Sequence, residues 1–267
     1  SIPAKEELVG GQSMSFVISA SSDMEKLSWR TAGPQNIFIQ KMVDFFWNVG
    51  APETEIDRLN DVGALINPTR IGSWIDMSGK GGMDGGWFFP VDIPAKLAIE
   101  AADAGDPTAK VTEWIDTHGV TSCFSVGRDM GAAPPRQTEI RLHLPGADFF
   151  AQYKVATDAF QSFGFPPIPD KANDLLQEFH AESLALSIIT SCEGFVRIGL
   201  LIPKPARELV NALIEFNNGR KDLVEKLEAA LGNTTGPEFV EYQYLMKGYG
   251  YGVYKEGFDI VFHWNAG

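Results

Sequence analysis

The chain has 267 residues, of which 44% are hydrophobic and 21% are charged, and its formal net charge is −13. This composition excludes a disordered chain, a collagen and a coiled coil. No apolar run reaches the roughly 18 residues of a membrane span, and no cluster of Lys and Arg offsets the acidic charge, so we expect no membrane or nucleic-acid partner and instead a small molecule.

Strand and helix patterns alternate along the chain. The first strand pair is predicted by the alternation in 13–33, which is interrupted by the polar turn at 22–25. Further pairs follow the same rule, and amphipathic helical stretches separate them. The five predicted hairpins span 13–33, 71–90, 120–145, 183–203 and 238–264. Helices are predicted over 36–50, 53–65, 94–118, 147–163, 170–181 and 205–231.

Five repeats of a hairpin followed by helices predict an α+β fold. One such unit of roughly 50 residues cannot bury its sheet alone, whereas five units in a ring cover every strand edge. We therefore expect one domain over 1–267, with a ten-stranded antiparallel β-barrel inside a ring of α-helices. About eight strands already suffice for a small ligand cavity, so ten predict a central chamber.

The same reasoning gives expectations about assembly and location. A closed barrel needs no partner to cover a strand edge, so a monomer is expected. Cys123 and Cys192 are too few to define a disulfide scaffold, and the first residues lack the apolar segment of a signal peptide. A cytoplasmic protein is the expectation.

Four short segments lie in successive predicted hairpins: KLSWR at 26–30, WFFP at 87–90, EIRLHLPG at 139–146 and VRIGLLIPK at 196–204. Together with the five-fold alternation, they resemble the ABBA or PT-barrel fold of soluble aromatic prenyltransferases, of the clorobiocin and naphterpin types. The resemblance covers nearly the whole chain. It implies transfer of a prenyl group from an allylic diphosphate to an aromatic small molecule by electrophilic alkylation.

The resemblance also implies which side chains bind the diphosphate. Arg30 and Arg197 stand at positions where this family places arginines, and Arg141 and Arg136 lie on the third hairpin, where the family also supplies cationic or amide groups. Basic groups are needed because the departing diphosphate is strongly negative.

Aromatic faces are needed to shield the allylic cation. Two tyrosine positions of the family are Gly86 and His143 here, so other rings would line the chamber. The candidates are Trp74, Phe88, Tyr249 and Tyr251.

The sequence departs from the family at charged positions as well. Two lysines that contact diphosphate in the family correspond to Asp84 and to Asp259 or Ile260. The aspartate that holds magnesium in naphterpin-type enzymes corresponds to Ser28, although Asp76 keeps a second acidic position. We therefore expect no cofactor and no magnesium requirement.

Three polar residues are candidate catalytic groups. Asp76 and Glu139 could orient a hydroxyl or amine of the acceptor, or each could simply pair with a neighbouring arginine. His143, like His263, could remove the proton from the alkylated ring, although a lone histidine on a strand is more often a hydrogen-bonded wall residue.

The missing lysines favour a rival hypothesis. The chain could be a PT-barrel that has lost prenyl transfer and acts as a small-molecule binding protein, or as a cyclase or isomerase that uses acids such as Asp84 and Glu139.

Overall fold

The computed structural model of the chain describes residues 13–19, 26–78, 83–102, 107–130, 136–232, 236–246 and 257–265. Within these ranges it contains eleven strands and eight helices. The strands are β1 (Ser13–Ser19), β2 (Lys26–Pro34), β3 (Arg70–Ser78), β4 (Met83–Phe89), β5 (Ile93–Pro94), β6 (Ser122–Asp129), β7 (Thr138–His143), β8 (Ala185–Ser191), β9 (Gly194–Pro203), β10 (Phe239–Leu245) and β11 (Gly257–Asn265). The helices are α1 (Gln35–Asn48), α2 (Glu53–Ile66), α3 (Ala95–Ala102), α4 (Pro107–His118), α5 (Phe149–Ser162), α6 (Asp170–Glu178), α7 (Arg207–Phe216) and α8 (Lys221–Leu231).

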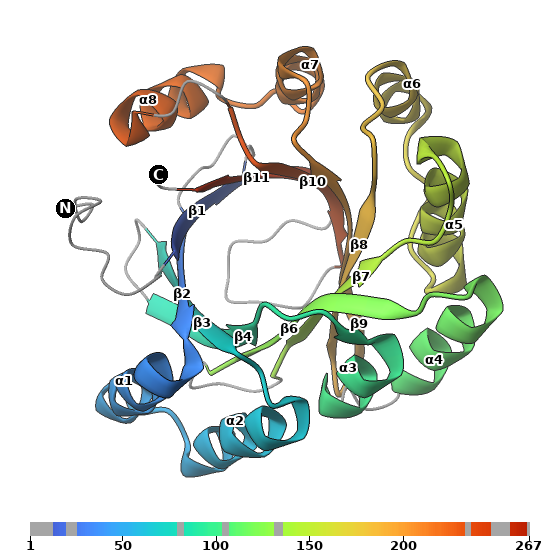
Figure 1. Cartoon of the computed structure of the whole chain (residues 1–267). Coiled ribbons are helices and arrows are strands. Elements are labelled where there is room, and N and C mark those ends of the chain that lie inside the picture. Colours follow the sequence, from blue (N-terminus) through green and yellow to red (C-terminus); the bar gives the residue numbers. More distant parts are fainter. Residues whose placement is uncertain are drawn as a thin grey trace.

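The strands form a single curled antiparallel sheet. Their order is β4-β3-β2-β1-β11-β10-β9-β8-β7-β6-β5. β4 pairs in addition with β6, with Gly86 opposite Asp129 and Phe89 opposite Val126, so the two ends of the sheet meet. Figure 1 shows the strands around a common centre and the helices on the outside.

The prediction of five hairpins separated by helices is confirmed. Each predicted hairpin contains one pair of long strands, and the helices lie in the predicted intervals. The structure adds the two-residue β5, in which Ile93 and Pro94 pair with Cys123 and Ser122 of β6. The prediction of ten strands missed it because two residues are too few to show alternation.

The two faces of the sheet differ in polarity. On β9 the outward residues Val196, Ile198, Leu200 and Ile202 are at most 1% exposed and belong, apart from Val196, to the hydrophobic core. These apolar residues pack against the helices. The helices contribute their own buried residues to the same core, such as Phe38, Met42 and Phe46 of α1. The main core therefore lies between the sheet and the helices. The inner face can carry polar groups because the stability of the fold rests on the outer one.

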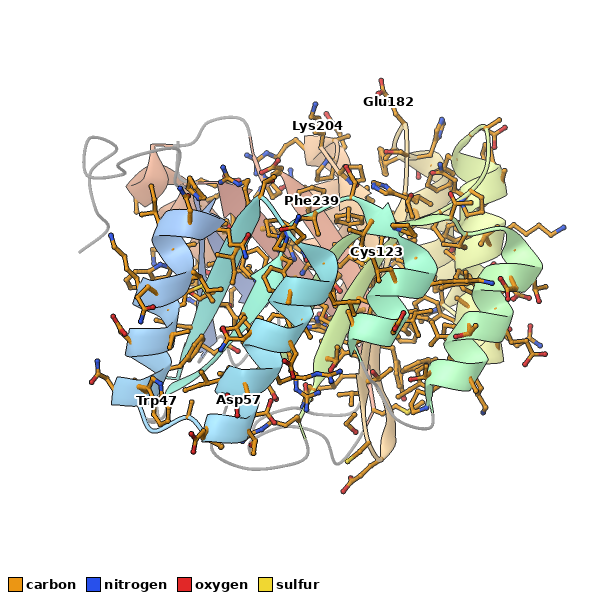
Figure 2. All side chains as sticks on the ribbon, turned by 60° about the horizontal axis from the view of Figure 1, so that its bottom comes forward. Trp47, Asp57, Cys123, Glu182, Lys204 and Phe239 are labelled. Carbon is orange, nitrogen blue, oxygen red and sulfur yellow. The ribbon has the colours of Figure 1, made fainter. Side chains whose placement is uncertain are left out.

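The two openings of the curled sheet, where the strands begin and end, have different connections. Figure 2 shows Glu182 and Lys204, which lie just before β8 and just after β9, at one edge of the molecule. Trp47 and Asp57, from the end of α1 and the start of α2, lie at the opposite edge. The first, where β9 leads toward α7, is called the helix-connection end, and the second is the end at which β8 turns into β9. Among the described residues, no helix is long and apolar enough to cross a bilayer.

Candidate functional site

A buried glutamate on β7 gathers three arginines inside the curled sheet. Oε1 of Glu139 accepts hydrogen bonds from Nη2 of Arg141 at 3.1 Å and from Nη2 of Arg197 at 3.0 Å. Its Oε2 lies 3.7 Å from Nη1 of Arg30. We call Arg30, Arg141 and Arg197 the arginine cluster. Ser187 on β8 donates a further hydrogen bond to Oε1, at 3.3 Å.

The topology explains how these side chains meet. Arg30 is on β2 and Glu139 is on β7, and these strands are not neighbours in the sheet. Their side chains can touch only across the interior. Glu139 and Arg141 are two residues apart and therefore point to the same face. Both side chains therefore face the interior.

Burial and charge act against each other at Glu139. Burial by itself would raise the pKa of its carboxyl, but the positive charges of the arginine cluster outweigh burial and lower the pKa to about 2. Glu139 is therefore ionised at neutral pH. It holds three like charges together in a volume from which water is largely excluded.

Arg30 and Arg141 differ in how their charges are compensated. Burial lowers the pKa of Arg30 to about 10, and the neighbouring charge of Arg141 acts in the same direction. The pKa of Arg141, in contrast, is raised, because Glu139 and Glu241 outweigh the effect of its burial. An added anion beside Arg30 would favour its charged form.

The cluster also has unused hydrogen-bond donors. The Nε–H groups of Arg30, Arg141 and Arg197 are buried and donate to no acceptor in the described part of the chain. A buried donor without a partner costs about 1–3 kcal/mol. Three such donors in one place are suited to an oxygen-rich anion.

Two aromatic rings cover Arg30. Its guanidinium carbon lies 5.9 Å from the ring centroids of both Trp74 and Phe88, within the range of a cation–π contact. The ring centroids are 6.4 Å apart. Glycines make this arrangement possible, because a β-carbon at Gly86 would overlap the Trp74 ring and one at Gly72 would overlap Phe88. Two of the four predicted lining residues, Trp74 and Phe88, thus lie beside the predicted diphosphate site.

A second acidic group was missed by the sequence analysis. Glu241 on β10 is completely buried, and its Oε1 lies 3.9 Å from Nη2 of Arg197. Its Oε2 lies 3.4 Å from Nε2 of His263 on β11. Alternation of Glu241 with the outward-facing Val240 and Tyr242 was the signal that could have identified it.

Asp76 lies close enough to influence the site. Its charge raises the pKa of Arg30, and Asp76 stands opposite Ser28 in the β2–β3 register. Asp84 follows in the register of β3 and β4, but its side chain lies outside the described ones. Tyr249 and Tyr251 also fall outside the described residues.

Two predicted residues do not join the cluster. His143 ends β7 at the helix-connection end, where its side chain is 53% exposed and its Nε2 lies 3.1 Å from Oδ1 of Asp92. Arg136 precedes β7 and lies 3.4 Å from Glu55 of α2. Arg136 is an odd number of residues from Glu139, so even an extended chain would direct it away from the interior.

The described side chains include no group of three or more His, Cys, Asp or Glu that could hold a metal ion. The arginine cluster supplies positive charge that faces Glu139 and Glu241.

Comparison with solved structures relates this geometry to known proteins. The fold matches 6-dimethylallyltryptophan synthase from Micromonospora olivasterospora, solved with DMASPP and Trp, with a TM-score of 0.65 and 13% identity over 95% of this chain and 81% of that one. The chain has the fold of the ABBA aromatic prenyltransferases. AnaPT from Neosartorya fischeri matches with a TM-score of 0.66 and 12% identity, over 96% and 78% of the two chains. 5-Dimethylallyltryptophan synthase from Streptomyces coelicolor matches with 0.65 and 9%, over 96% and 81%.

Sequence comparison gives a different kind of relative. A PH domain-containing protein of Dictyostelium discoideum is 64% identical over 271 residues, covering all of this chain. The chain spans 59% of the length of that protein. No family model matches the chain. The likeness to prenyltransferases is therefore one of fold, and the clorobiocin or naphterpin subtype remains a prediction.

Proposed function

We propose that the chain is an aromatic prenyltransferase, which moves a prenyl group from an allylic diphosphate to an aromatic small molecule inside a closed PT-barrel. The observation that carries this proposal is the arginine cluster, with three unused buried Nε–H donors beside two aromatic rings. The solved relatives include one bound to DMASPP and Trp and one bound to brevianamide F and DMSPP.

The chemistry follows from the placement of the charges. The diphosphate would bind to Arg30, Arg141 and Arg197, which stabilise the negative charge that develops as the allylic C–O bond breaks. The electron pair of that bond leaves with the diphosphate. Trp74 and Phe88 would shield the allylic cation with their ring faces until the acceptor ring attacks it. Exclusion of water protects the cation from hydrolysis.

We propose that the reaction needs no magnesium. Three guanidinium groups already converge on the site, and Arg–phosphate contacts combine charge with directional hydrogen bonds. The arginines would replace the lysines that the family places at the positions of Asp84 and of Asp259 or Ile260. Arg136, which pairs with Glu55, has no part in this site.

The test is turnover. Purified protein is incubated with dimethylallyl diphosphate and a panel of phenols, indoles and aromatic amino acids, and pyrophosphate and alkylated product are measured together. Equal amounts of both support the proposal. Absence of both across the panel, with longer prenyl diphosphates included, would refute it.

One observation favours the rival function, a binding protein without prenyl transfer. Glu139 already occupies the arginine cluster, and with Glu241 it reduces three positive charges to one. A buried site with one net charge suits a monoanion, such as an aromatic carboxylate, better than a diphosphate with several charges. Competition between an aromatic carboxylate and pyrophosphate distinguishes the two functions. A prenyltransferase should bind pyrophosphate more tightly than the carboxylate, and a binding protein should show the reverse order.

A further inference from the structure

Glu241 and His263 form a pair of unsatisfied buried groups. Oε2 of Glu241 and Nε2 of His263 lie 3.4 Å apart, with side chains 0% and 8% exposed. In the described part of the chain, neither atom has a hydrogen-bond partner, and neither does Oε1 of Glu241. A buried carboxylate normally accepts several hydrogen bonds, so Glu241 is suited to stabilise a protonated imidazole beside it.

The surroundings keep a place for this pair. A β-carbon at position 199, on the neighbouring strand β9, would overlap the Glu241 carboxylate, so the glycine there leaves room for this side chain. Arg197 links the pair to the diphosphate site, since its Nη2 lies 3.0 Å from Glu139 and 3.9 Å from Glu241. The pair is thus one guanidinium away from the proposed leaving group.

The pKa values of His263 and Glu241 are both lowered, so at neutral pH the imidazole is neutral and the carboxylate is charged. Burial lowers the pKa of His263 to about 4, with Arg141 and Arg30 acting in the same direction against Glu241. Burial would raise the pKa of Glu241, but Arg197, His263 and Arg141 lower it. At neutral pH a neutral imidazole therefore lies next to a carboxylate, and the negative charge of Glu241 would stabilise a proton added to His263.

We propose that His263 and Glu241 are the proton-accepting pair of the site, in which His263 takes the proton that the alkylated ring must lose and Glu241 stabilises the resulting imidazolium. This inference rests on the proposed function. The diphosphate leaves with the electron pair of the C–O bond, and the acceptor ring forms the new C–C bond. The ring C–H bond then breaks, its electron pair restores aromaticity, and its proton moves to the imidazole of His263.

A weak base is sufficient for this step. The arenium ion formed by alkylation is a strong acid, so a neutral imidazole can deprotonate it even with a depressed pKa. The proton then lies between Nε2 and the carboxylate as a charge-assisted hydrogen bond. It passes to solvent when the product leaves. His263 is the catalytic residue, and Glu241 is a positioning residue.

The experiment measures an isotope effect on His263→Gln and Glu241→Gln. Ring-deuterated and ordinary acceptor are compared, and pyrophosphate is measured with the alkylated product. We expect wild type to show almost no effect of deuterium. His263→Gln should still release pyrophosphate, but form product at least about tenfold more slowly and with a primary isotope effect above about 2, because deprotonation becomes rate-limiting. Glu241→Gln should shift in the same direction by less.

His180→Gln is the matched control, because that exposed histidine lies outside the site and its ring packs against Phe149 and Phe150. It should behave as wild type. Normal product formation without an isotope effect in His263→Gln would overturn the pair and leave the diphosphate as the base.

A second measurement does not depend on turnover. The chain has four histidines, and His263→Gln assigns the His263 signals in an NMR titration. The pair predicts titration near pH 4, lowered further by Glu241→Gln because a favourable negative charge is lost. If His263 titrated near pH 6.5 and its pKa did not change in Glu241→Gln, the proposed role of the pair would be wrong. Absence of pyrophosphate release by wild type would refute the proposed function, and this titration would then decide on the pair alone.

Discussion

Arg30 on β2 and Glu139 on β7 lie 3.7 Å apart, although neither strand is a neighbour of the other in the sheet. The contact shows that charged side chains from distant strands meet in the interior. Each arginine of the cluster has Glu139 as its counter-ion, so removal of any one charge changes the environment of the others.

Arg197→Lys should separate charge from geometry. Lysine keeps the positive charge near Glu139 and Glu241, but it cannot bond two anion oxygens with a planar fork. We expect near-native thermal stability and at least about tenfold weaker pyrophosphate binding, measured by calorimetry. Equal binding by the variant would show that Arg197 contributes only charge.

Arg197→Ala should abolish turnover at a greater cost in stability. It leaves the buried Glu241 with less compensation, and loss of one partner of a buried ion pair costs about 3–5 kcal/mol. Circular dichroism establishes whether the fold remains before activity is assayed. A folded variant with wild-type turnover would remove Arg197 from the diphosphate site.

Glu139→Gln should make stability depend on anions. The arginine cluster loses its shared counter-ion, so we expect a loss of about 3–5 kcal/mol in the free energy of unfolding. Pyrophosphate should restore much of it and should bind more tightly than to wild type, because it no longer competes with the carboxylate. A variant equally destabilised with and without millimolar pyrophosphate would contradict this role.

Acid should destabilise the protein in two steps. The folded-state pKa of His263 is about 4, below its ordinary value of 6.5, so the unfolded chain takes up this proton first and stability falls between pH 6.5 and 4. That difference corresponds to roughly 3 kcal/mol. The pKa of Glu139 is lowered from 4.5 to about 2, so its contribution is lost between those values. Denaturant unfolding of His263→Gln should lack the first step, and an unchanged profile would contradict it.

Gly86→Ala should damage the aromatic pair. The new methyl group would overlap the Trp74 ring and the carbonyl oxygen of Arg128, so we expect a loss of about 1–3 kcal/mol and a changed tryptophan fluorescence. The control is Gly63→Ala in α2, where the nearest atom is at an ordinary 3.7 Å from the added carbon. There alanine should stabilise the helix by about 0.5–1 kcal/mol. Similar changes in both variants would show that the overlap at Gly86 has no effect.

Much of the fold could be predicted from periodicity. The five hairpins and the helices between them follow alternation of two and 3.6 residues, and the inward direction of Glu139 and Arg141 follows from the same rule. Alternation predicts which face of the sheet a side chain points to, but not how deep in the interior it lies. His143 shares that direction, yet it ends β7 and is half exposed at the rim.

Contacts between distant strands could not be predicted in this way. Arg136 pairs with Glu55 because α2 lies beside the residue that comes two positions before β7, which depends on three-dimensional packing. Glu241 became important only because Arg197 and His263 lie on the strands beside it. A single acidic residue in an otherwise ordinary strand carries no motif.

The arginine cluster should bind a prenyl diphosphate without a metal ion. The decisive experiment is calorimetric titration of the wild-type chain with an unreactive thio-analogue of dimethylallyl diphosphate, with magnesium and with EDTA. We expect micromolar binding that is the same in both buffers. No binding at millimolar analogue would contradict the site, and binding in magnesium alone would contradict its independence of metal.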